Sequence, residues 1–122
     1  MNVRAIGFDF FGTLIDATAE VTVCLGNICT QLELHNIPIS REEFTQTYRQ
    51  VTHSYREERH HAFKEVNNAH WLQDTLKRLG YDLPIASQPI QEAVNAYFSP
   101  WNLRVYDDVY PILDKLITKY PL

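Results

Sequence analysis

The order of hydrophobic and polar positions predicts one buried strand at the start of the chain. Residues 3–10 are apolar apart from Arg4 and Asp9, and their β-branched and aromatic members are typical of a short strand covered on both faces. Residues 12–13, Gly-Thr, then interrupt the run. A lone strand has no partner for its backbone N–H and C=O groups. We therefore expect either a strand from another chain or a longer fold of which this sequence is the first part.

The remaining pattern predicts helices. Apolar residues recur every three or four positions over residues 17–36, 41–66, 67–80 and 90–98, and again after Asp108, which can cap a final helix. Ser40 and Glu43 form a capping box at the start of the second segment, and Gly80 is a typical C-terminal cap of the third. Residues 99–108 are expected to be an extended connection. The predicted product is mostly α-helical with one core strand.

Composition narrows the class of protein. The 122 residues are 45% hydrophobic and 21% charged, as in a globular chain, and the net charge is -4. Because no basic stripe is present to displace phosphate counterions, we expect no nucleic-acid partner. We also expect no membrane association, since no apolar run approaches the roughly 20 residues that span a bilayer. Cys24 and Cys29 lie on different faces of a predicted helix, which favours free thiols in the core and a cytoplasmic location.

Asp9 stands where the predicted strand ends, and this position suits a nucleophile. The carboxyl end of a parallel strand is the edge at which α/β folds bind ligands. An ionised carboxylate there can attack an electrophile and form an acyl-phosphate or ester that water later hydrolyses. The Gly12-Thr13 turn supplies N–H groups and a hydroxyl for phosphate oxygens. Two anions repel each other, so phosphoryl chemistry at Asp9 calls for Mg²⁺. A plain turn cap at Asp9 is the alternative.

The stretch FDFFGTLID resembles the first motif of the haloacid dehalogenase-like (HAD) hydrolase superfamily, an apolar strand followed by D-x-x-G-T-L-x-D. The resemblance implies an α/β, Rossmann-type core with an inserted four-helix cap. Residues 1–16 and 101–122 would then be a partial core, and residues 17–100 the helical cap domain. The resemblance covers all 122 residues but only about the N-terminal half of a family member.

The resemblance also implies a site. Asp9 would be the catalytic nucleophile and, with the backbone carbonyl of Phe11, a ligand of Mg²⁺. Gly12, Thr13 and Asp16 would contact the substrate, a small phosphorylated or halogenated metabolite; a helix N-cap is the alternative for Asp16.

Phe11 departs from the phosphatase pattern of the family. Phosphatases of this family usually carry a second Asp there, which protonates the leaving oxygen and then activates water. Phe can do neither, although its backbone carbonyl remains available to a metal. Dehalogenating members carry an aromatic Tyr at this position. They need no proton donor for the leaving group, because a halide leaves unprotonated. Phe11 therefore argues against the phosphatase interpretation and favours the dehalogenase interpretation, and both stay open.

The later motifs of the family do not appear in this sequence. We expect the Asp107-Asp108 pair to cap a helix rather than to bind a metal, and Lys115 and Lys119 to face solvent. A nucleophile without its partner groups should be close to inert. The alternative function is a catalytically dead helical interaction module that forms a homodimer or joins a complementing chain through its exposed half-core.

Two further groups of residues have open interpretations. His53, His60 and His61 share a predicted helix without a spacing that makes a metal-binding face, so we expect them in solvent. Four aromatic residues either form the core of the helical segment or line a pocket facing Asp9: Trp71, Tyr97, Phe98 and Trp101.

Overall fold

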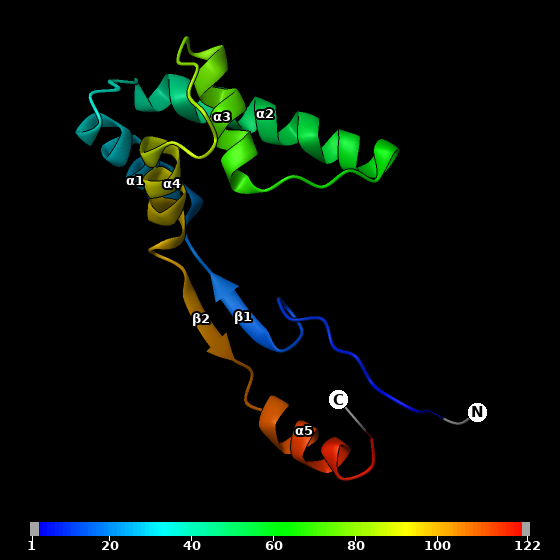
Figure 1. Ribbon diagram of the computed structural model, residues 1–122. Coiled ribbons are helices and arrows are strands. Elements are labelled where there is room, and N and C mark those ends of the chain that lie inside the picture. The colour runs from blue at the N-terminus through cyan, green and yellow to red at the C-terminus, as the bar shows by residue number, and fades with distance from the viewer. Residues whose placement is uncertain (1–2, 121–122) are drawn as a thin grey trace. The chain divides into compact units, whose positions relative to one another are not determined.

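The structure is a computed structural model that describes residues 3–120. It is mostly α-helical, as predicted, with a small two-stranded sheet (Figure 1). The described elements, in chain order, are β1 (Ile15–Thr18), α1 (Val21–Leu34), α2 (Arg41–Ala62), α3 (Asn68–Arg78), α4 (Gln88–Phe98), β2 (Asn102–Val105) and α5 (Val109–Ile117).

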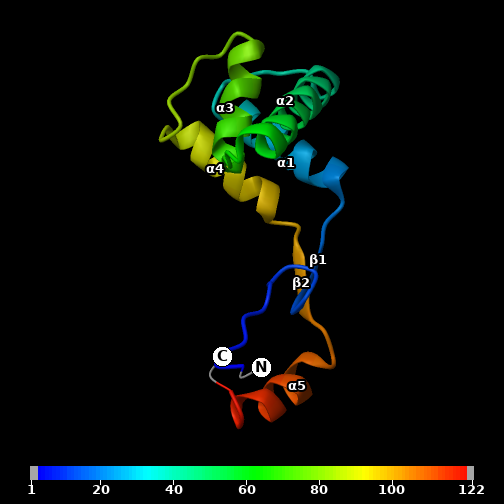
Figure 2. The ribbon, with the colours of Figure 1, turned by 90° about the vertical axis from the view of Figure 1, so that its right-hand side faces the viewer.

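The chain divides into two compact units. One is Glu20–Pro100, which contains α1 to α4; the other combines residues 3–19 with residues 101–120 and contains both strands and α5 (Figures 1 and 2). The sequence-based boundaries were 16/17 and 100/101. The assignment of the units to a catalytic core and a cap stays a prediction.

The helical unit has its own hydrophobic core. Helix α1 packs against α4, α2 packs against α3, and α3 also contacts α4 (Figure 2). Phe44 on α2 is fully buried, and its ring stacks on that of Tyr48 with a centroid distance of 5.7 Å. The core consists mainly of the positions that the helical spacing selects, including Leu25, Ile28, Leu32, Leu72, Leu76, Ile90 and Ala93.

The ends of the helices follow local chemistry. The Ser40 hydroxyl accepts a hydrogen bond of 3.4 Å from the Glu43 N–H, which is the predicted N-cap of α2. Helix α2 was expected to reach residue 66, but it ends at Ala62 because Phe63 adopts a left-handed conformation with φ 51°. Gly80, with φ 93°, follows α3 as predicted.

The two cysteines are free and buried, as predicted. Both lie on α1, and burial raises the pKa of the Cys29 thiol to about 11. They act as small core residues rather than as a disulfide or a reactive pair. Among residues 3–120, no helix combines the length and apolar character needed to cross a bilayer.

The predicted strand over residues 3–10 is wrong. This segment has no regular secondary structure, and most of its residues are exposed. Within the described chain, residues 3–9 make no backbone hydrogen bond to another segment. A strand is stable only when a neighbour satisfies its N–H and C=O groups, and no segment of residues 10–120 pairs with residues 3–9 in this way.

The strands that do form were not predicted. β1 pairs antiparallel with β2 in the register Ile15 with Val105, Asp16 with Arg104, Ala17 with Leu103 and Thr18 with Asn102. Residues 17 and 18 had been assigned to the first helix, which instead begins at Val21 after an N-cap at Glu20. Four-residue strands of mixed polarity give too short a pattern for periodicity to detect.

Hydrogen bonds around Glu92 join α4 to α1. Its Oε2 lies 2.7 Å from the ring Nε2 of His35 and accepts a 3.0 Å bond from the Gln31 amide, while its Oε1 accepts a 2.7 Å bond from Gln88. The hydrogen bonds from Gln88 and His35 lower the pKa of the Glu92 carboxyl below its ordinary value of 4.5. The ionised carboxylate therefore stabilises the folded helical unit.

This lowered pKa predicts a pH dependence. A carboxyl whose folded pKa is depressed contributes stability above its unfolded pKa and loses it as the pH falls through the folded value. We expect Glu92→Gln to lower the urea midpoint at neutral pH, and the difference from the parent chain to shrink as the pH falls below 4.5. The control is Glu42→Gln, at an exposed position on α2. A difference that stays constant with pH would contradict this account.

Candidate functional site

Asp9 comes directly before a tight loop formed by residues 10–15. The Phe10 carbonyl accepts hydrogen bonds from the N–H groups of Leu14 (2.9 Å) and Ile15 (3.1 Å). The Gly12 N–H donates in turn to the Ile15 carbonyl at 2.8 Å. These bonds bring the chain back on itself immediately after the carboxylate.

Gly12 is required by backbone conformation. Its φ of 79° lies in the left-handed region that L side chains rarely adopt, and a Cβ built there would meet no heavy atom within 4 Å. Its N–H is already bonded to Ile15, so it is not free to hold a phosphate oxygen. In this loop conformation, the predicted phosphate contacts would have to come from Thr13.

Asp9 and Phe11 are both exposed. Phe11 keeps 59% of its surface accessible, and its ring meets that of Phe10 edge-on with a centroid distance of 5.2 Å. The Asp9 carboxylate is therefore accessible to a substrate from solution. Phe11 also lies outside the hydrophobic core, so a change of its side chain should cost little stability.

A cavity of about 200 Å³ lies beside this loop in the same unit. Thr13 is the one predicted site residue among those that line it. The wall is mainly apolar, with Asp108 at the start of α5 as its acidic residue. The lining residues are Phe8, Thr13, Leu14, Asp108, Val109, Ile112 and Leu113. The contribution of α5 to this cavity was not anticipated, because the sequence carries no motif that links residues 108–113 to the loop.

Asp16 lies on β1, half-buried, and not at a helix N-cap. Its partner across the sheet is Arg104, whose guanidinium contacts both carboxylate oxygens of Asp107 at 3.1 Å. Asp16 thus follows the loop directly and is held by the sheet. Its role toward a substrate stays a prediction.

The donors at the predicted metal site are of a suitable chemical type. A carboxylate and a backbone carbonyl are the oxygen ligands that Mg²⁺ prefers. Asp9 and Phe11 would supply two of about six ligands. Over residues 3–120, no group of three or more His, Cys, Asp or Glu side chains is placed to hold a metal ion. The Mg²⁺ site at Asp9 and the Phe11 carbonyl therefore stays a prediction.

Several other expectations can be compared with the structure. Asp108 is the N-cap residue of α5 as predicted, although its side chain makes no capping hydrogen bond. Lys115 and Lys119 are exposed, as predicted. So are the three histidines of α2, His53, His60 and His61.

The structure places Trp71, Tyr97, Phe98 and Trp101 differently. Trp71 and Tyr97 pack against the core of the helical unit, which confirms the core interpretation for these two. Phe98 is 46% exposed, and Trp101 belongs to the other unit.

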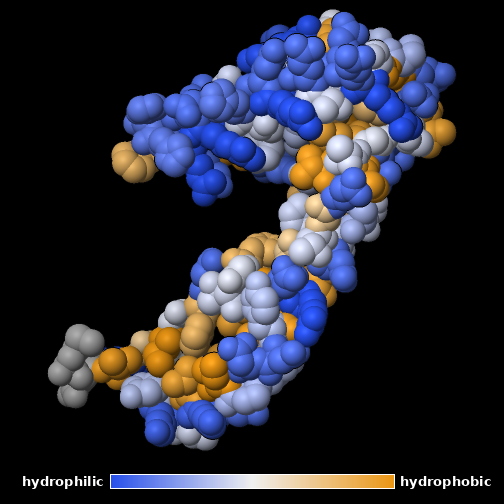
Figure 3. All heavy atoms as spheres, turned by 180° about the vertical axis from the view of Figure 1, so that it is seen from behind, coloured by the Kyte–Doolittle hydropathy of each residue, from blue (hydrophilic) through white to orange (hydrophobic). Residues whose placement is uncertain are grey.

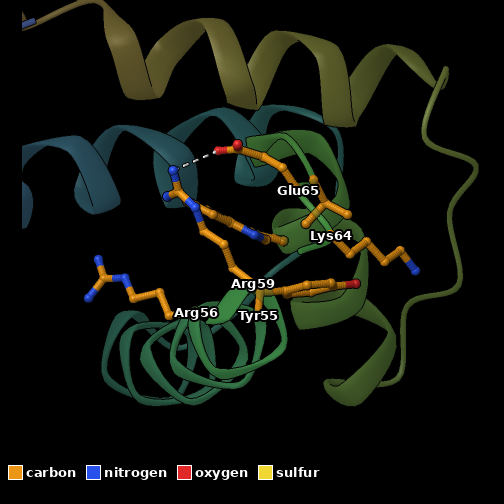
Figure 4. Close-up of a pocket in the computed structure, with 7 residues that line it drawn as sticks. Tyr55, Arg56, Arg59, Lys64 and Glu65 are labelled. Carbon is orange, nitrogen blue, oxygen red and sulfur yellow. Dashed lines mark ion pairs between the residues drawn. The ribbon is translucent and has the colours of Figure 1, made fainter. Parts of the chain in front are cut away.

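A second cavity, of about 170 Å³, lies in the helical unit between the end of α2 and the start of α3 (Figure 4). Arg56 and Arg59 contribute to its wall. Their spacing of three positions places the two arginines on neighbouring positions of the α2 surface.

Comparison with known proteins finds no family model, no curated protein and no solved structure that matches this chain.

Proposed function

We propose that this chain carries the nucleophilic segment of a HAD-like hydrolase that acts on a small phosphorylated or halogenated metabolite. The main support is the FDFFGTLID motif together with its geometry: an exposed Asp9 carboxylate directly followed by a hydrogen-bonded loop with Gly12 at φ 79°. The remaining catalytic groups would come from residues outside this sequence or from a second chain.

The proposed reaction has two steps. An Asp9 oxygen attacks the phosphorus or the halogen-bearing carbon, a new O–P or O–C bond forms, and the leaving group departs with the bonding electrons. A halide leaves as the anion, whereas an alkoxide leaving group needs a proton. Water then cleaves the acyl-phosphate or ester and restores the Asp9 carboxylate.

For the phosphoryl reaction, Mg²⁺ would be held by the Asp9 carboxylate and the Phe11 carbonyl. The ion would offset the repulsion between the carboxylate and the phosphate. Thr13, which lines the neighbouring cavity, would donate its hydroxyl to a substrate oxygen. Phe11 offers no proton, so the chain's own residues suit halide displacement better than alcohol release.

The test is turnover by the purified chain, with a phosphate ester plus Mg²⁺ and separately with a 2-haloacid. We expect slow turnover that Asp9→Asn reduces at least about tenfold, because the attacking carboxylate is lost. Asp82→Asn, at an exposed position outside the motif, should leave the rate unchanged. Turnover of neither substrate, or equal rates for Asp9→Asn and the parent chain, would contradict the proposal.

A second candidate function, association with another copy of the chain, is favoured by a separate observation. The N-terminal segment and α5 expose large apolar side chains, and orange hydrophobic atoms gather over this unit in Figure 3. Residues 3–9 also make no backbone hydrogen bond to another described segment. The exposed residues are Phe8, Phe10, Phe11, Leu103, Tyr110, Ile112 and Ile117. Pairing of residues 3–9 between two copies would satisfy the backbone groups and cover part of this surface.

Light scattering tests this second function. We expect the chain to have twice the mass of a single copy, and Val3→Pro, which removes an N–H within the pairing segment, to shift it toward the monomer. The control is Leu34→Ser, which removes an apolar side chain that is 72% exposed in the helical unit. We expect this variant to keep the mass of the parent chain. A monomeric parent chain would contradict the association.

A further inference from the structure

The wall of the second cavity, in the helical unit, carries a net positive charge, although the chain as a whole is negatively charged. Its wall contains three cationic residues, Arg56, Arg59 and Lys64, and one acidic residue, Glu65. Three positive charges minus one negative charge leave a local excess of two, in a protein whose net charge is -4. The rest of the wall is Tyr55, Val66 and Trp71. A cationic cavity with aromatic and apolar walls is suited to a small organic anion.

Trp71 supplies a hydrogen-bond donor without a protein acceptor. Its indole Nε1 is buried, and no described group accepts a hydrogen bond from it. Burial of an N–H without a partner is unfavourable, so such a group favours a ligand that brings an acceptor. The Tyr55 hydroxyl, in contrast, donates to the Asp74 carboxylate at 2.5 Å and is already engaged.

Arg59, which lines this cavity, forms only a weak ion pair. Arg59 Nη2 lies 3.5 Å from Glu65 Oε1, and the two side chains are 61% and 72% exposed. Exposed ion pairs of this kind contribute little to stability, so another carboxylate can replace Glu65 at small cost. Figure 4 shows the Arg59 guanidinium turned toward Glu65, with the Lys64 amine and the Arg56 guanidinium pointing away from this pair. Arg59 is therefore the relevant cation.

We propose that this cavity binds a small organic carboxylate. The carboxylate accepts a hydrogen bond from the Trp71 indole and pairs with Arg59 in place of Glu65, while its apolar body lies against Val66 and the aromatic rings. The volume of about 170 Å³ equals roughly five to six water-sized volumes, which suits a one-ring or short-chain acid. The site does not depend on Asp9, and its failure would leave the proposed hydrolase function untouched.

The experiment is a ¹H–¹⁵N NMR titration of the full chain at constant ionic strength, with benzoate, acetate and inorganic phosphate as probes. Each of the two tryptophans gives an indole resonance, and the Trp71 resonance is assigned with Trp71→Phe. Trp101, which belongs to the other unit, serves as the internal reference. We expect benzoate to shift the Trp71 resonance saturably, with a Kd of about 1 mM, and acetate to bind more weakly.

Three variants identify the contacts. Arg59→Gln should weaken benzoate binding about tenfold, since a charge-assisted hydrogen bond is lost. Glu65→Gln should strengthen it, because the competing carboxylate is removed. Arg49→Gln, at an exposed arginine of the same helix that does not line the cavity, should have no effect.

Three results would overturn the proposal. They are an unmoved Trp71 resonance at about 20 mM benzoate, an unchanged Kd for Arg59→Gln, and a response to phosphate as strong as that to benzoate. The last would show that charge alone, without the apolar wall, determines binding.

Discussion

Phe44→Ala should lower the free energy of unfolding of the helical unit by about 3–5 kcal/mol. Phe44 is fully buried on α2, and its ring stacks on that of Tyr48 at a centroid distance of 5.7 Å. The substitution removes the buried ring, leaves a cavity and ends the stacking contact. Because whole domains are stable by only about 5–15 kcal/mol, this one change removes a large share of the total. Urea unfolding followed by circular dichroism measures the loss.

Phe63→Ala is the matched control for this prediction. Phe63 follows the same helix but is 93% exposed, so its replacement removes no buried contact. We expect a change within about 0.5 kcal/mol. Equal losses for the two variants would mean that the stability of the unit does not come from the core that Phe44 occupies.

Phe11→Asp should raise the rate of alkyl phosphate hydrolysis by about 10²-fold or more, since a positioned general acid and base contributes about 10²–10⁴-fold. The new carboxyl would stand two residues after Asp9, protonate the leaving oxygen and then activate water. Turnover of a 2-haloacid should not rise, because the halide needs no proton. Phe11 is 59% exposed, so the change should leave the fold intact. Phosphate and halide release are measured on the same preparation.

Phe10→Asp separates this chemical effect from added charge. Phe10 is the neighbouring residue and is 53% exposed, but a carboxyl there lies at the wrong position of the motif. We expect no gain in phosphate release. A gain from Phe10→Asp equal to that from Phe11→Asp, or no gain from either variant, would contradict the role assigned to residue 11.

The helical part of the fold could be predicted from the sequence because helices are specified locally. Leu25, Ile28 and Leu32 recur with helical spacing and are buried, and the Ser40 hydroxyl caps α2 as its position suggests. β1 and β2 could not be predicted, since each depends on a partner more than 80 residues away in the chain. The expected strand at residues 3–10 failed for the same reason, because local pattern cannot provide a neighbouring strand.

The candidate site was predictable in part. The sequence predicted a turn at residues 12–13, and Gly12 has a φ of 79° in the loop after Asp9. The role of Asp9 stays a prediction. Sequence could not anticipate that the Gly12 N–H bonds to Ile15, or that α5 lines the cavity beside Thr13, because both follow from tertiary geometry. The cationic cavity depends on the turn at Phe63, where the chain leaves α2 in a left-handed conformation that no pattern indicated.

The nucleophilic role of Asp9 is tested most directly by intact-mass spectrometry after incubation with each substrate. Without a base at residue 11, water should cleave the covalent intermediate slowly, so the adduct should accumulate where the leaving group departs without a proton, as a halide does. We predict a mass gain equal to the mass of the 2-haloacid less that of the hydrogen halide, and a gain of about 80 Da where the phosphate ester reacts in the presence of Mg²⁺. Peptide mapping should place the adduct on Asp9, and Asp9→Asn should abolish it. An unmodified parent chain, or an adduct that persists in Asp9→Asn, would contradict the proposal.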